Sequence, residues 1–318
     1  MKRSVTLWFV IVLFAVVTVA SMLAQGRPLA QPPAAAPVLA QGQPAAPPQP
    51  AGQRQAAGGI QMQAAAPRLA TREVVDDVYQ IALGLDSVCM YVLVGRDKAL
   101  VVDTQTMTEF EGKKIIDYVR DITQKPLIVV NTHPHGDHTA ANAQFGEVHL
   151  SVAGVDEIKA GAAKRSTPVT YTLTGVKEGH VFDLGDRQIE VIDIPAHSSG
   201  SIALLDRKAG YLFTGDEIDP GQVVGMNPKT IQLHHANMKK LYDKYYGRIT
   251  LLVPAHNGAP VTKRYIKYFM DLDAKIMAGT ATVVPTADGP NYAVPVSENQ
   301  VRYRENFAAI IYTKPAQK

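Results

Sequence analysis

The chain has 318 residues, of which 46% are hydrophobic and 19% charged, enough for one large folded domain or two small ones. Six of its 32 lysines and arginines precede Glu73, the first acidic residue, which leaves 26 basic against 29 acidic side chains from there onward. This part therefore carries a net charge of −3, although the whole chain carries +3, and that sign argues against nucleic acid as a partner. Cys89 is the only cysteine, which excludes an internal disulfide.

The N-terminal quarter is expected to lie outside the folded domain. Lys2 and Arg3 precede the apolar run LWFVIVLFAVVTVA, and small residues follow it, which is typical of an export signal over residues 1–24. The run is also almost long enough for a membrane anchor. We therefore expect a periplasmic or extracellular protein that stays at the membrane only if this segment is retained. Residues 25–70 are rich in Ala, Pro and Gln and are predicted to be a disordered linker.

Residues 71–280 alternate between strand-like and helix-like runs, which predicts a layered α/β domain. We expect strands at 78–83, 87–95, 98–105, 126–132, 148–152, 181–185, 188–195, 201–208, 211–216 and 249–256. We expect helices at 109–123, 139–144, 155–161, 232–247 and 262–279. Residues 281–318 form a C-terminal extension that could pack on the domain.

The segment NTHPHGDHTAAN, residues 131–142, holds three histidines and an aspartate in six consecutive positions after the apolar run PLIVV. Alternation along an extended chain directs His133 and His135 to the same side. Asp137 and His138 follow where the chain is expected to turn into a helix. Each of these groups would need a partner if buried, and a metal ion supplies one. We therefore interpret the cluster as metal ligands.

Three further candidate ligands end other strand-like runs, where the site residues of layered α/β folds tend to lie. His197 ends VIDIPAH, Asp216 ends YLFTGD, and His256 ends ITLLVPAH. The other histidines lack this setting and are predicted to be surface or structural residues, although one of the last two could border the site: His149, His180, His234 and His235.

The motifs VVDT, THPHGDH, IPAHSSGS, FTGDE and VPAHNG, in this order over residues 73–279, resemble those of the metallo-β-lactamase fold superfamily. The resemblance implies a four-layer αββα sandwich with a two-metal centre along one edge of the sheets. It also implies the role of each residue: His133, His135 and His197 around one ion, Asp137, His138 and His256 around the other, Asp216 bridging them, and Asp103 bracing the ligand loop.

A ligand set of imidazoles and carboxylates suits two zinc ions and leaves iron or manganese open. Two such ions about 3.5–4 Å apart can share a hydroxide. We expect this hydroxide to attack the carbonyl of a small acyl substrate, an ester, thioester or lactone, with Asp137 and Asp216 as catalytic residues. Zinc β-lactamases commonly have cysteine or serine where this chain has Asp216, so β-lactam cleavage is a weaker expectation.

The subfamily and the type of activity stay open at this point. Ala140, Ala141, Ala196 and Asn257 stand where glycine is common in the glyoxalase II and lactonase groups. One alternative is an iron-dependent oxidoreductase on the same fold, and another is a binding protein with a vestigial metal site. The basic residues beyond His256 are typical of a solvated helix face, although they could meet an anionic substrate: Lys263, Arg264 and Lys267.

Overall fold

The computed structural model describes residues 68–84, 87–284 and 299–315. The expected export signal at 1–24 and the expected linker up to residue 67 lie outside the described residues, as does part of the C-terminal extension. In the part of the chain that is described, no helix has both the length and the apolarity needed to cross a membrane.

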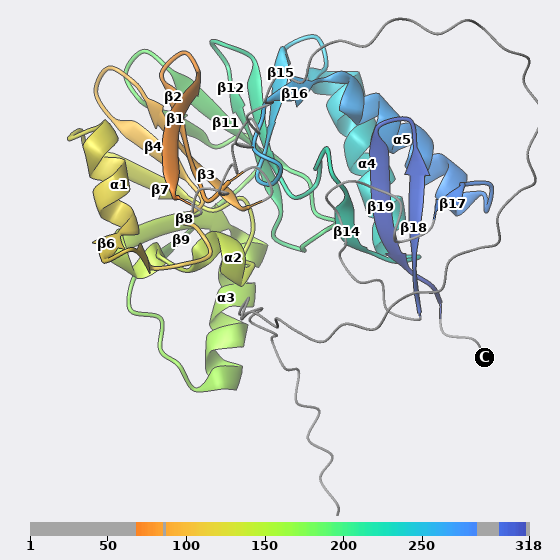
Figure 1. Cartoon of the computed structure of the whole chain (residues 1–318), viewed down its shortest axis with the longest axis horizontal. Helices are drawn as coiled ribbons and strands as arrows, with labels where there is room; N and C mark the ends of the chain where they lie inside the picture. The colour runs from red at the N-terminus through yellow and green to blue at the C-terminus, as the bar shows by residue number, and fades with distance from the viewer. Residues whose placement is uncertain (1–67, 85–86, 285–298, 316–318) are drawn as a thin grey trace, which may run out of the picture. The chain divides into compact units, whose positions relative to one another are not determined.

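Two sheets form the body of the domain (Figure 1). The first sheet has seven strands in the order β1 (Ala70–Val75), β2 (Val78–Ala82), β3 (Cys89–Val94), β4 (Ala99–Val102), β7 (Leu127–Val130), β8 (Glu147–Ser151) and β9 (Thr172–Val176). The second has six in the order β10 (Val181–Asp183), β11 (Gln188–Asp193), β12 (Ile202–Asp206), β13 (Tyr211–Gly215), β15 (Leu251–Pro254) and β16 (Val261–Thr262). Strands β4, β7, β8 and β9 run parallel, as do β13 and β15.

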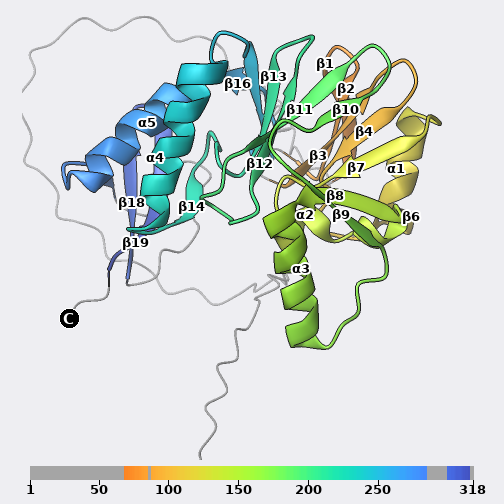
Figure 2. The ribbon, with the colours of Figure 1, turned by 180° about the vertical axis from the view of Figure 1, so that it is seen from behind.

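Helices lie on the outer side of each sheet. Figures 1 and 2 show α1 (Ile115–Ile122) and α3 (Val152–Arg165) on one side, and α4 (Thr230–Lys240) and α5 (Arg264–Met277) on the other. The short helix α2 (Gly136–Thr139) follows β7. A small sheet packs against α5, in the order β14 (Val223–Met226), β19 (Ala308–Thr313), β18 (Gln300–Glu305) and β17 (Val283–Val284).

Three hydrophobic cores separate these layers. Successive side chains of a strand point to opposite faces, so β3 contributes Tyr91 and Leu93 to the core between the sheets, and Met90 and Val92 to the core beneath α1 and α3. The third core joins the second sheet to α4 and α5. The layers therefore run helix, sheet, sheet, helix, and the expected αββα sandwich is confirmed.

Several predicted elements differ from the observed ones. The helix expected at 109–123 begins only at Ile115, because Glu111 and Gly112 have positive φ angles of 50° and 77° and form the turn of a small hairpin. That hairpin joins β5 (Glu109–Phe110) to β6 (Lys113–Lys114). The helix expected at 139–144 is divided between α2 and a 3-10 turn at Asn142–Gln144. The strands β1, β9, β14, β16 and β17 to β19 were not predicted.

Candidate metal centre

The candidate residues gather at one edge of the two sheets because they all follow the carboxyl ends of strands that point the same way within their sheet. In the first sheet, the parallel strands β4 and β7 lead to Asp103 and to the loop that carries the histidine cluster. In the second, β11 and β13 are both antiparallel to β12, and β15 is parallel to β13. These three strands lead to His197, Asp216 and His256.

A close backbone approach joins the two sheets beside this edge. The Ile202 amide donates a hydrogen bond to the Thr132 carbonyl at 2.9 Å. Gly215 has a φ of 54°, and a Cβ atom at this position would lie 2.9 Å from the Thr132 side chain. Only glycine fits this conformation and this contact without strain, and the contact places Asp216 against the loop that holds His133.

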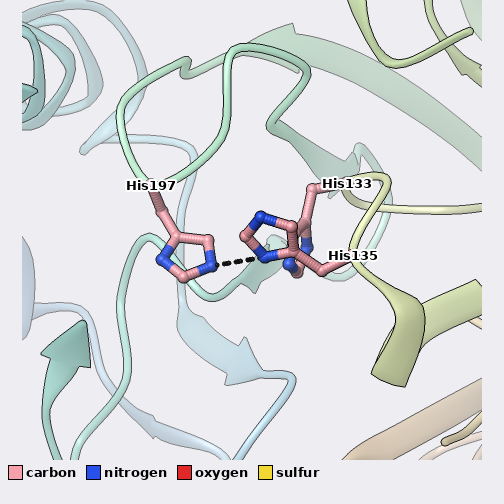
Figure 3. A group of neighbouring side chains, drawn as sticks. All are labelled: His133, His135 and His197. Carbon is pink, nitrogen blue, oxygen red and sulfur yellow. Dashed lines mark hydrogen bonds between the residues drawn. The ribbon is translucent and has the colours of Figure 1, made fainter. Parts of the chain in front are cut away.

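The first cluster consists of His133, His135 and His197 (Figure 3). His197 comes from the loop between β11 and β12, whereas the other two come from the loop after β7. Nε2 of His197 lies 3.0 Å from Nδ1 of His135, and one nitrogen of each ring lies within 4.8 Å of the others. Imidazole nitrogens at this spacing can bind one ion together.

The second cluster consists of Asp137, His138, Asp216 and His256, again with one atom of each within 4.8 Å of the others. Nε2 of His138 lies 3.5 Å from Asp137 Oδ2 and 3.4 Å from Asp216 Oδ1. Nε2 of His256 lies 3.7 Å from Asp137 Oδ2 and 3.3 Å from Asp216 Oδ2. Two imidazoles and two carboxylates thus face one position.

Asp216, a member of the second cluster, also lies close to the first. Its Oδ2 is 3.8 Å from His133 Nε2 and 3.5 Å from His197 Nε2, both in the first cluster. Since the same atom is 3.3 Å from His256 Nε2, one carboxylate reaches both sets of ligands.

Three buried atoms that face into the clusters have no hydrogen-bond partner among the described residues: His133 Nε2, His138 Nε2 and Asp216 Oδ1. A buried polar atom without a partner costs roughly 1–3 kcal/mol. Three such atoms in one region make a protein-only arrangement unfavourable, whereas metal ions bound by the two clusters would give all of them a partner. The residues present therefore fit a metal centre.

Asp103 forms hydrogen bonds with the loop that carries the histidine cluster. It is fully buried and has a φ of 61°, a left-handed conformation that aspartate adopts more readily than most residues. Its Oδ1 accepts a hydrogen bond from the Thr132 amide at 2.7 Å, and its Oδ2 lies 2.9 Å from His138 Nδ1. Because a carboxylate only accepts, Nδ1 of His138 donates, and a metal ion in the second cluster would be bound through Nε2.

Two groups that the sequence did not predict hold His197. The Val224 carbonyl in β14 accepts a hydrogen bond from His197 Nδ1 at 2.9 Å, which leaves the lone pair of Nε2 facing the cluster. Glu217, which is 1% exposed, accepts hydrogen bonds from the backbone amides of Ala196 and His197. Its position directly after Asp216 was the only signal for it in the sequence.

Burial and neighbouring charges shift the pKa values of the side chains in the site. Burial and the nearby charge of His138 hold the pKa of His133 well below its usual value, so this imidazole is neutral. Burial alone would raise the pKa of Asp216, but the charge of His138 holds it well below its usual range. Burial alone would lower the pKa of His138, but the charges of Asp216 and Asp103 raise it well above its usual value. This ring would therefore release a proton when a metal ion binds.

The histidines that were predicted not to be ligands lie outside both clusters. His149 contacts the Val129 carbonyl, and His180 is exposed. His234 is fully buried between α4 and α5, and His235 contacts the Met270 carbonyl.

Two of the three basic residues after His256 make structural contacts. Lys263 donates to the Tyr246 and Ile249 carbonyls, and Lys267 lies over the ring of Tyr242.

Residues 83–256 match the family described as the metallo-beta-lactamase superfamily. The match covers more than half of the 318 residues, so the chain belongs to this superfamily. The resemblance seen in the motifs is thereby confirmed.

Among curated proteins, the chain is similar to the human acyl-coenzyme A thioesterase MBLAC2, with 30% identity over 132 residues, 34% of this chain and 47% of the relative. It is also similar to the hydroxyacylglutathione hydrolase of Chelativorans sp. (strain BNC1), with 31% identity over 109 residues, 34% of this chain and 40% of the relative. The aligned part thus spans less than half the length of either relative.

Solved structures share the fold. A metallo-β-lactamase from Pontibacter korlensis superposes with a TM-score of 0.52 at 17% identity, over 65% of this chain and 99% of that chain. The rubredoxin oxygen:oxidoreductase of Desulfovibrio gigas gives a TM-score of 0.51 at 14% identity, over 65% of this chain and 62% of that chain. A hydrolase and an oxidoreductase therefore share the fold, and the fold does not assign the reaction.

Proposed function

We propose that this chain is a two-zinc hydrolase that cleaves an ester, thioester or lactone bond of a small acyl substrate. The proposal is carried by the three unpartnered buried atoms that face into two adjoining clusters of imidazoles and carboxylates. The relatives named as acyl-coenzyme A thioesterase and hydroxyacylglutathione hydrolase support an acyl substrate.

The first cluster would hold one ion and the second cluster the other, with Asp216 shared between them. Bound zinc supplies a Lewis acid for a carbonyl and a source of hydroxide near neutral pH. The protein fixes where this chemistry occurs, because Asp103 orients His138 and the Val224 carbonyl orients His197. The Asp137 side chain is 42% exposed, so the substrate would approach from its side of the site.

Cys89 does not offer an alternative nucleophile. Burial raises the pKa of its thiol to about 11, so it is protonated at neutral pH, and only the thiolate attacks carbonyls effectively. Its sulfur lies in the core between the two sheets. The reaction would thus be a direct hydrolysis by water rather than one that passes through an acylated cysteine.

Metal analysis combined with a substrate panel tests the proposal. Purified protein should contain about two zinc ions per chain, lose thioester or lactone cleavage when a chelator removes them, and regain it when zinc is restored. Protein with no bound metal and no acyl hydrolysis would contradict the proposal. Bound iron with oxygen uptake would identify an oxidoreductase instead, and cleavage of β-lactams alone would identify a β-lactamase.

Replacing the shared carboxylate should abolish turnover without unfolding the domain. Asp216→Ala removes the group between the clusters, and we expect activity to fall at least about 100-fold because both ions lose a ligand. His180→Ala is the matched control, since His180 is exposed and lies outside both clusters. Steady-state kinetics and circular dichroism of both variants check this, and equal activity in the two would show that the site is misassigned.

We also propose that the protein is exported. The basic start, apolar run and small residues of positions 1–24 support export, and the Ala- and Pro-rich sequence that follows would act as a tether. Cell fractionation with mass analysis of the mature N-terminus tests this. Full-length protein with Met1 in the cytosolic fraction would contradict export.

A further inference from the structure

Glu217 connects the segments that carry two of the candidate ligands. Its Oε1 accepts hydrogen bonds from the amides of Ala196 and His197, at 3.1 and 2.7 Å. Its own backbone directly follows Asp216. One side chain therefore joins the loop after β13 to the loop after β11.

Hydrogen bonds also hold the backbone of Glu217 itself. His234 in α4 donates from Nε2 to the Glu217 carbonyl at 2.7 Å, and the Glu217 amide donates to the Thr214 carbonyl at 3.3 Å. From the same helix, Asn237 donates to the Pro195 carbonyl at 3.1 Å. Helix α4 thus holds both loops from outside, and the carboxylate of Glu217 joins them from within.

The contacts of Glu217 depend on the reach of its side chain. Both amides meet the same oxygen, whereas Oε2 is buried and has no hydrogen-bond partner among the described residues. A carboxamide oxygen at the same position could accept both hydrogen bonds. An aspartate is shorter by one carbon–carbon bond, about 1.5 Å, and could not reach both amides from the same backbone position.

We propose that Glu217 is a positioning residue for the metal site formed by His133, His135 and His197. The length of its side chain sets the backbone of His197 and thereby the distance of His197 Nε2 from the two other imidazoles. This inference rests on the proposed function, because it concerns a metal ion bound by the first cluster.

Two substitutions separate reach from charge. Glu217→Gln keeps the reach and removes the charge, whereas Glu217→Asp keeps the charge and removes the reach. We expect Glu217→Asp to weaken binding of one of two zinc equivalents about 10- to 100-fold, and to leave the other within about threefold. For Glu217→Gln we expect both affinities within about threefold of the wild type.

The measurement is a zinc titration of metal-free protein against a competing chromophoric chelator, without any substrate. The absorption spectrum of the cobalt-loaded protein gives a second readout, which should change for Glu217→Asp and stay close to that of the wild type for Glu217→Gln. Glu190→Gln is a matched control. Glu190 is 8% exposed and pairs with Arg207 and Arg248, so its loss should lower stability but leave both zinc affinities unchanged.

Each outcome decides the inference. Wild-type zinc affinity in Glu217→Asp would overturn it. If Glu217→Gln also bound zinc more weakly than the wild type, the charge of Glu217 and not the length of its side chain would be responsible. An equal loss at both sites in step with unfolding would overturn it in favour of a general structural role. Wild-type protein that binds no metal would overturn the proposed function and this inference together.

Discussion

Around the candidate metal centre, the backbone conformation of single residues explains which departures from glycine are tolerated. Asn257 stands where related sequences commonly have glycine, and its φ of 61° is one that glycine adopts freely. Asparagine tolerates this conformation better than most residues, and its side chain here donates to Asp219. Ala140, Ala141 and Ala196 have no positive φ, so alanine there carries no such cost.

A pair of substitutions at Asn257 isolates the backbone cost. Alanine and glycine both remove the hydrogen bond to Asp219, but only alanine pays for the left-handed conformation. We expect Asn257→Ala to be less stable than Asn257→Gly by about 1 kcal/mol in chemical denaturation. A more stable alanine variant would show that residue 257 leaves this conformation.

The candidate ligands could be predicted from the sequence, whereas the groups that hold them could not. Each ligand follows an apolar strand, so local sequence places it at a strand end. The carbonyl of Val224 carries no side-chain signal, and β14, with four residues of which one is glycine, is too short to be recognised as a strand. The contact of Glu217 with the His197 amide depends on a separation of 20 residues that only the folded sheet closes.

At the level of elements, the helices α4 and α5 are joined by a buried polar pair. His234 is fully buried, and its Nδ1 lies 2.7 Å from Oδ2 of Asp273 in α5. Its other nitrogen donates to the Glu217 carbonyl. Burial alone would lower the pKa of His234, but the charge of Asp273 raises it to about 9. The imidazolium form therefore stabilises the contact between the helices.

This pair should make stability depend on pH. Because the pKa of His234 is higher in the folded than in the unfolded protein, its stabilisation is complete below about pH 6.5 and is lost as the pH rises through about 9. We expect the free energy of unfolding to fall by on the order of 3 kcal/mol over that range. His234→Gln should remove this fall, whereas His180→Gln, at an exposed position, should retain it. Parallel curves for wild type and His234→Gln would contradict the assignment.

Helices and strands were predicted where apolar residues repeat with a clear period along the sequence. They were missed where the strands are polar or short. The strand β1 is largely exposed, with the sequence ATREVV, and is defined only by its pairing with β2. Helix α1 begins late because the sequence EGKK forms a turn with left-handed residues instead of a first helical turn. In both places the pairing of neighbouring strands, rather than the pattern of apolar residues, decides the structure.

In the whole molecule, the hydrophobic core extends beyond the part that matches the family. The match ends at residue 256, yet Ala308 and Ile310 of β19 are fully buried with residues of α4, α5 and the second sheet. Strand β19 also pairs with β14, which carries the carbonyl that orients His197. The described part of the C-terminal extension therefore belongs to the same packed core.

Truncating one core residue of this extension should destabilise the whole domain. Ile310→Ala removes buried side-chain atoms and should cost about 2–5 kcal/mol, whereas Ile310→Val should cost about 0.5–1.5 kcal/mol. In calorimetry, we expect one transition whose midpoint falls by roughly 5–15 °C for the alanine variant. A separate low-temperature transition, or no change in either variant, would show that the hairpin of β18 and β19 folds independently.

The contact between Gly215 and Thr132 places the candidate site on the seam between the two sheets, with ligands on both sides of it. An ion bound there would cross-link the two sheets, because separating them would break its coordination. Its binding energy would then resist unfolding of the entire domain. A chelator that removes the ion would therefore lower the stability of the domain as well as its activity. The contact between the two sheets would weaken, and the chain would be cleaved faster by proteases.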